Sequence, residues 1–232
     1  AGNPNNFGGT GAPPTHPALL DFLADWFTKK NGSVKKLNAL ILSSKTYRRS
    51  SRHSNPDELL EKDPKGKLYA TFRPRRLSAE EIRDAMLFAS GELNLSGGGI
   101  PARPDLNREV AFQPRQIMGG VASVYEPDPL PEQRNRRTIY VEKIRGLRDP
   151  FLETFNQPGP DNSCEVRETS TVAPQALTLM NAEEVQDRAL AFAHRLLRGK
   201  NRKPENLVIE EAFQRALGRT ATQNEVEICL QR

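Results

Sequence analysis

The fold is decided by residues 78–91, which read SAEEIRDAMLFASG. Ser78 followed three residues later by Glu81 is typical of a capping box, in which each of the two side chains accepts a hydrogen bond from a backbone N–H at the start of a helix. Apolar side chains then repeat at helical spacing, and Gly91 is a typical stop. The stretch therefore predicts an amphipathic helix over 79–90.

The same signals recur on both sides of this helix. They predict helices over 16–30, 34–46, 175–180, 182–198 and 204–217, a short helical turn at 151–155, and a last helix after a Thr222–Glu225 cap. Gly199 is the predicted stop of the helix over 182–198. Residues 138–144 are β-branched and aromatic and favour a strand, and 68–72 favour a second short strand or an extended segment.

The fold class that follows is mainly α. We expect one irregular helical domain over 1–232, with six or seven helices, one or two short strands and a long middle segment rich in Pro and Gly. Its parts are an N-terminal helical part (1–96), an irregular loop region (97–135), and a strand, a polar loop and C-terminal helices (136–232). A loop as long as 97–135 is typically either functional or disordered.

Composition excludes several classes of protein. Two Cys cannot make a disulfide scaffold, and three scattered His argue against a metal site built from His. No phosphate-binding Gly-rich motif is present, and no apolar run is long enough to span a membrane. For Cys164 and Cys229, a mutual disulfide, two free thiols or pairing with another part of a longer protein all stay open.

The charge is unevenly distributed. Lys and Arg number 34 against 29 Asp and Glu, but 45–76 carry a net +6 and 134–148 a net +5, which leaves −6 for the remainder. Such segregation indicates an anionic partner, or basic loops that pair with acidic helices of the same protein. The candidate anion-binding residues are Arg48, Arg49, Arg73, Arg75, Arg136 and Arg137. We expect a polyanion or glycan rather than nucleic acid, because aromatic residues make up only 6% of the chain.

A second candidate site is a set of polar residues. Acids, an Arg fork, hydroxyls and amides are the groups that bind polar ligands such as sugars, and also the groups that a buried loop needs for its own backbone. The richest stretch, 153–175, also contains Asn156, Cys164, Thr169 and Ser170. The candidate polar-ligand residues are Arg76, Glu81, Arg83, Asp84, Glu153, Asp161, Arg167, Thr171 and Gln175. No catalytic residue and no metal ligand is assigned.

Four ordered motifs resemble one known module. They are PPTHPALLD (13–21), RRLSAEEIRDA (75–85), TVAPQAL (171–177) with Met180-Asn181, and RALGR (215–219) followed by Thr222. The chain resembles the C-terminal domain of unknown function in large planctomycete proteins that often carry a cytochrome c-type domain.

This resemblance implies an exported, multidomain protein, of which we expect the chain to be a piece. It also implies an extracytoplasmic location and other domains of the same longer chain as partners. Haem is expected only in a separate domain, because no haem-attachment motif occurs here. The family has no established activity, so the resemblance assigns no catalytic residues.

The leading hypothesis is a helical module that serves assembly or binds a polar ligand and has no self-sufficient catalytic motif. One alternative is a hydrolase-like or carbohydrate-processing domain with Glu153, Asp161, Arg167 and Asp84 or Glu81 in a cleft, which requires two carboxylates facing each other. The other is polyanion binding through 45–76 and 134–148.

Overall fold

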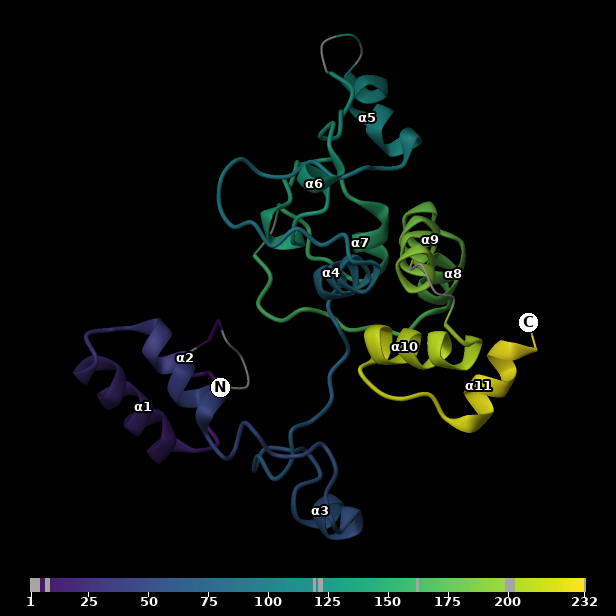
Figure 1. The fold of residues 1–232 in the computed structure, drawn as a ribbon. Helices are drawn as coiled ribbons and strands as arrows, with labels where there is room; N and C mark the ends of the chain where they lie inside the picture. The colour runs from purple at the N-terminus through teal and green to yellow at the C-terminus, as the bar shows by residue number, and fades with distance from the viewer. Residues whose placement is uncertain are drawn as a thin grey trace. The chain divides into compact units, whose positions relative to one another are not determined.

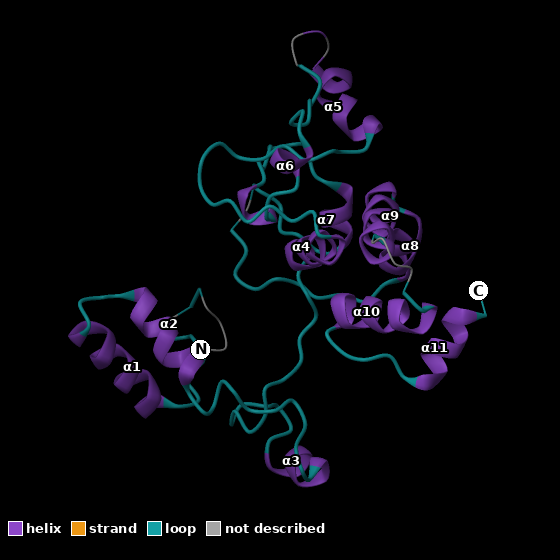
Figure 2. Cartoon of the chain, in the orientation of Figure 1, coloured by secondary structure: helices purple, strands orange, loops and turns teal. Residues whose placement is uncertain are grey.

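The computed structural model describes residues 5–6, 9–118, 120, 123–161, 163–198 and 203–231. The chain divides into two compact units, unit 1 (Ala1–Arg76) and unit 2 (Leu77–Arg232). Half of the chain is helical, and the described residues form eleven α-helices and no β-strand, as Figures 1 and 2 show. The mainly α class is therefore confirmed, whereas the expected strands and the count of six or seven helices are wrong.

Unit 1 contains three helices, α1 (Pro17–Lys29), α2 (Val34–Ser43) and α3 (Pro56–Lys62). Pro17 opens α1, and His16 takes the N-cap position. Ser33 caps α2 as expected, since its hydroxyl accepts a hydrogen bond from the Lys36 N–H. The turn at Asn31-Gly32, where both residues have positive φ, lets α2 return along α1 as a hairpin (Figure 1).

Unit 2 contains the other helices. Its first half holds α4 (Ala79–Ser90), α5 (Arg108–Met118), α6 (Pro131–Arg134) and α7 (Pro150–Thr154). Its second half holds α8 (Ala173–Asn181), α9 (Glu183–Leu197), α10 (Glu205–Leu217) and α11 (Gln223–Leu230). The capping box at the start of α4 is present, and a second one opens α11. None of the described helices combines the length and apolar character that a membrane crossing requires.

Three helices lie where the sequence predicts only loop. Asn55 caps α3, and α5 and α6 interrupt the region 97–135, of which 119 and 121–122 lie outside the described residues. The sequence did not predict α5 because it contains Pro114, and a proline usually interrupts a helix. It did not predict α6 because this helix is a single turn. The predicted stop at Gly199 also lies outside the described residues. The division of the chain at 96 and 135 stays a prediction.

Neither predicted strand forms. Residues 138–140 are a turn of 3-10 helix, η2, because the Tyr140 N–H bonds to the Arg137 carbonyl and the Thr138 N–H bonds to the side chain of Asp84. In 68–72, Tyr69 has a φ of 54°, which interrupts an extended chain. Where the structure describes the chain, β-pairing is limited to isolated bridges, such as the one between Ala102 and Val141.

All the buried apolar side chains among the described residues belong to unit 2. One cluster joins α4, α7 and α9, and it consists of Ala79, Phe151, Leu152 and Phe155 with Ile82, Met86 and Val185 packed against it. The other consists of Ala111, Tyr125 and Leu147 with Leu106, Val110 and Ile144. The first cluster holds α4, α7 and α9 together. These helices carry Arg83 and Asp84, Asp149 at the N-cap, and Glu184, respectively.

Candidate functional site

The best-buried charged group is Arg83 on α4, whose side chain is 3% exposed. Its guanidinium donates hydrogen bonds to the carbonyls of Arg134 (3.0 Å) and Arg136 (3.1 Å) and to the Thr138 hydroxyl (3.2 Å). Its Nε lies 3.4 Å from a carboxylate oxygen of Glu184 on α9. Arg83 therefore joins α4, the 134–138 segment and α9. Its two terminal nitrogens donate hydrogen bonds within the protein, whereas its buried Nε is only ion-paired with Glu184 and makes no hydrogen bond.

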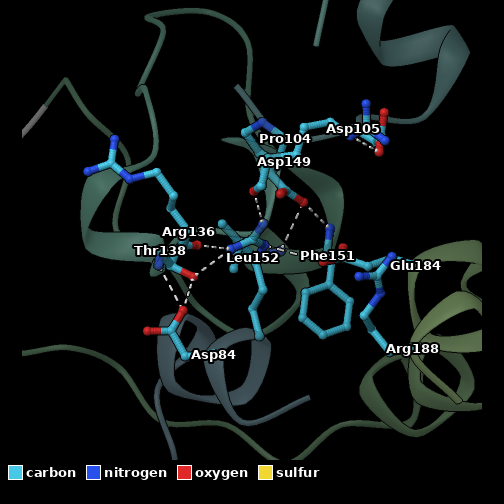
Figure 3. Close-up of polar contacts among 12 residues, drawn as sticks. Asp84, Pro104, Asp105, Arg136, Thr138, Asp149, Phe151, Leu152, Glu184 and Arg188 are labelled. Atoms are coloured by element: carbon cyan, nitrogen blue, oxygen red, sulfur yellow. Dashed lines mark hydrogen bonds and ion pairs between the residues drawn. The ribbon is translucent and has the colours of Figure 1, made fainter. Parts of the chain in front are cut away.

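Asp84, the next residue on α4, holds the same segment. One of its carboxylate oxygens accepts hydrogen bonds from both the backbone N–H and the hydroxyl of Thr138, each at 2.7 Å, as Figure 3 shows. The other oxygen pairs with Arg137 at 3.5 Å. Arg83 and Asp84, two of the predicted polar-ligand residues, therefore bind main chain and Thr138, which the sequence placed in a strand.

Two carboxylates near Arg83 lie in surroundings that disfavour their charge. Burial raises the pKa of Glu184 to about 7; Asp149 and Asp105 add to the rise, while Arg83 and Arg188 oppose it. Burial also raises the pKa of Asp149, partly offset by the N–H groups of Leu152 and Phe151 that it caps at the start of α7 (Figure 3). The ion pair with Arg83 does not outweigh burial at Glu184, because the contact is long and two other acids are near.

A second polar network surrounds Gln175 on α8, which is almost completely buried. Its amide nitrogen donates to the Thr154 carbonyl (3.0 Å), to Asn156 Oδ1 (3.2 Å) and to Ser170 Oγ (3.2 Å). The Ser170 hydroxyl donates to the same Asn156 oxygen at 2.7 Å. The network bonds the polar loop to the start of α8, which agrees with the structural alternative for this stretch.

The remaining acids of the hydrolase hypothesis are each paired. Glu153 contacts Arg148, and Asp161 lies 3.8 Å from Arg145. Arg167 pairs with Glu80 at 2.5 Å, and the Gln157 amide also donates to Glu80. Burial alone would raise the pKa of Glu80, but the hydrogen bonds from Arg167 and Gln157 lower it overall. These pairs give no support to a catalytic pair of carboxylates.

The other predicted polar-ligand residues lie outside both networks. Glu81 completes the capping box with Ser78, because its carboxylate accepts a hydrogen bond from the Ser78 N–H at 2.8 Å. Arg76 and Thr171 are exposed. Sequence reasoning missed three partners of these residues: Glu184, Thr138 and Arg134. Glu184 lies in the first turn of α9, whose N-cap is Ala182 without a side-chain cap.

The candidate anion-binding arginines fall into two groups. In unit 2, Arg136 is used internally: its guanidinium donates to the carbonyls of Ser96, Gly98 and Ile100 and lies over the Tyr140 ring. In unit 1, Arg49 donates one N–H to the Ala70 carbonyl, and Arg73 donates to the Asp63 carbonyl at 3.4 Å. Arg48 and Arg75 are exposed.

Neither of two hollows in the described part of unit 2 is a well-formed ligand pocket. One is a cavity of about 40 Å³ beside Asp149 and Leu152, enough for water but far below the size of a typical ligand pocket. The other is an open hollow of about 570 Å³ lined by Asn107, Arg108, Glu109, Phe112 and Glu183. Within the described part of the chain no group of His, Cys, Asp and Glu could hold a metal, and Cys164 and Cys229 are exposed free thiols.

Comparison with known proteins gives one result. The family described as PSD1, a protein of unknown function (DUF1553), matches residues 1–232. No curated protein and no solved structure matches the chain. The chain belongs to the PSD1 (DUF1553) family.

Proposed function

We propose that this chain is a non-catalytic assembly module, and that α1 and α2 are its docking surface for another protein domain. The observation that carries the proposal is that neither helix contains a buried residue. The polar groups that could have formed a catalytic site are instead bonded to one another in unit 2. Function is therefore best sought on the surface.

The uncovered apolar face of α1 and α2 is large. Leu23, Trp26 and Phe27 on α1 and Leu37 and Leu40 on α2 are partly buried. Beside them, other apolar side chains are exposed: Leu19, Leu20, Phe22, Val34, Ile41 and Leu42. Two short helices owe most of their stability to packing of an amphipathic face, so an uncovered face of this kind marks a protein–protein contact.

Charge indicates the kind of partner. Unit 1 contains 14 Lys and Arg against six Asp and Glu, a net +8. Two copies of this unit would repel each other because both are positively charged. A partner surface with an apolar centre and an acidic rim would instead be attracted to unit 1. The occupant that we propose is therefore an acidic-rimmed apolar surface of another protein domain.

The resemblance of the four motifs supports a more specific setting. In that setting the partner is another domain of the same longer chain, in an exported planctomycete protein that also carries a cytochrome c-type domain. Haem would belong to that separate domain, and the module would be extracytoplasmic. The motifs support this setting, and sequencing of the complete gene would test it.

The docking surface can be tested with designed peptides. The probe is an amphipathic helical peptide with leucines on one face and glutamates along its edges. The first control replaces the glutamates with lysines, and the second keeps the glutamates but replaces the leucines with serines. We expect the probe to bind and both controls to bind at least about 10-fold more weakly, because the surface requires both apolar contact and charge.

A double variant locates the site. Leu20→Asp with Leu42→Asp should abolish binding of the probe, because both side chains are about half exposed on the docking face (55% and 51%). Leu217→Asp, at a similarly exposed position on α10 of unit 2, should leave binding unchanged. Equal binding of the three peptides, or full binding by the double variant, would overturn the proposal.

A further inference from the structure

Two segments of unit 1 that lie about twenty residues apart in sequence are joined side by side. The Phe72 N–H donates to the Ser50 carbonyl at 3.1 Å, and the Arg49 guanidinium donates to the Ala70 carbonyl at 3.0 Å. The rings of Tyr47 and Phe72 also meet edge to face, with centroids 5.5 Å apart. We name residues 44–52 and 69–76 together the basic–aromatic surface.

This surface carries charge of one sign. Its two segments contain seven Lys and Arg and no Asp or Glu. Lys45, Arg48 and Arg52 are exposed, and no acid among the described residues forms an ion pair with them. The other basic stretch, 134–148, differs, because its arginines bond to carbonyls or pair with acids such as Asp84, Glu153 and Asp161.

Half-exposed aromatic rings lie among these charges. Tyr47 is 44% exposed and Phe72 is 45% exposed. Each ring is therefore partly covered by the other and partly open to solvent. Tyr69 contacts the His16 ring at 5.0 Å in the same unit. An aromatic face attracts the positively polarised C–H groups of a sugar ring, and a guanidinium binds sulfate or carboxylate through two parallel hydrogen bonds.

We propose that the basic–aromatic surface binds an anionic polysaccharide, a sulfated or carboxylated glycan. The sulfate or carboxylate groups contact Lys45, Arg48 and Arg52, and a sugar ring lies against the Tyr47–Phe72 pair. Single-stranded nucleic acid fits less well, because successive bases stack on separate ring faces, whereas Tyr47 and Phe72 lie edge to face and Tyr69 lies against His16. This activity is independent of the docking surface on α1 and α2.

The test measures binding of heparin to the whole chain. We expect binding at about 50 mM salt that weakens at least about 10-fold by about 200 mM, as binding to a linear polyanion does. The triple variant Lys45→Gln, Arg48→Gln, Arg52→Gln should weaken binding about 10-fold or more. The matched control Arg137→Gln, Lys143→Gln, Arg145→Gln loses the same charge from unit 2 and should weaken binding less than 2-fold or so.

A third variant tests the rings. Tyr47→Ser should weaken heparin binding but leave its salt dependence unchanged, because no charge is lost. Undetectable heparin binding at low salt, equal loss in the two triple variants, equal binding of neutral dextran, or tighter binding of a single-stranded oligonucleotide of the same charge would each overturn the proposal. The Tyr47→Ser variant keeps this test separate from that of the docking surface, because it loses no charge and should bind the leucine–glutamate peptide as the parent chain does.

Discussion

At the scale of single residues, Arg83 holds unit 2 together. It is buried, and its partners are two carbonyls, one hydroxyl and the Glu184 carboxylate. Arg83→Met should therefore lower the free energy of unfolding by about 3–5 kcal/mol, because Glu184 loses its ion-pair partner and the two carbonyls lose their hydrogen-bond donor. The control Arg137→Met removes a half-exposed pair with Asp84 and should cost less than about 1 kcal/mol. Urea unfolding of both variants measures the difference, and equal costs would contradict a central role for Arg83.

Glu184 makes stability depend on pH. Its pKa is near the usual glutamate value when unfolded and about 7 when folded, so the folded protein binds more protons between these values. The contribution of Glu184 to the free energy of unfolding is therefore fully present below about pH 4.5 and is lost as the pH rises toward 7. The raised pKa of Asp149 acts in the same direction.

We expect Glu184→Gln to flatten this pH dependence, because the amide has nearly the same size as the carboxyl group but does not ionise. The measurement is the urea midpoint at pH 5 and pH 7.5 for both proteins. An equal loss of stability in the variant and the parent chain would show that Glu184 does not titrate in this range.

At the scale of elements, two of the described helices end at a glycine, and a side chain of another helix lies against only one of these glycines. Gly91 and Gly218 both end helices in the left-handed region, with φ of 85° and 67°. A Cβ at Gly91 would lie 3.0 Å from Arg195, which donates hydrogen bonds to the Phe88 and Ala89 carbonyls at the end of α4, whereas at Gly218 nothing lies within 4 Å.

Gly91→Ala should therefore destabilise the protein more than Gly218→Ala. Both substitutions carry the backbone cost of about 1–2 kcal/mol for a left-handed alanine, and only the first displaces Arg195. Thermal unfolding followed by circular dichroism compares the two. A larger loss for Gly218→Ala would show that the Arg195 contact contributes little.

The elements also show what kind of signal sequence reasoning reads well. Two helices with a clear start signal, an apolar stripe and a Gly stop lie within a residue or two of their predicted bounds. They are α4, which starts with a capping box, and α10, which starts after Pro204. The strand predicted for 138–144 does not form. Its β-branched residues fit the strand pattern, but Thr138 is held by a hydrogen bond to Asp84 on α4, which lies 54 residues earlier in the chain.

At the scale of the whole molecule, stability is unequally divided. The described buried apolar side chains all belong to unit 2, so residues 77–232 alone should unfold cooperatively, with a midpoint close to that of the intact chain. Residues 1–76 alone should show helical signal without a cooperative transition, because the described residues of this unit include no buried apolar side chain to oppose the chain entropy. Circular dichroism of the two fragments tests this, and a sharp transition for 1–76 would contradict it.

The sequence by itself determined the mainly helical class, most helix positions and the uneven charge, because caps, apolar spacing and composition act over a few residues. From the sequence, Arg83, Asp84 and Gln175 were candidates for a polar-ligand site, and that role stays a prediction. Only the tertiary structure decided what these groups do. Their partners, Thr138, Glu184 and the loop carbonyls, come from distant parts of the chain, and a hydrogen bond or ion pair across such distances leaves no local pattern. The same reason applies to Tyr47 and Phe72, which meet only because Phe72 bonds to the backbone of Ser50.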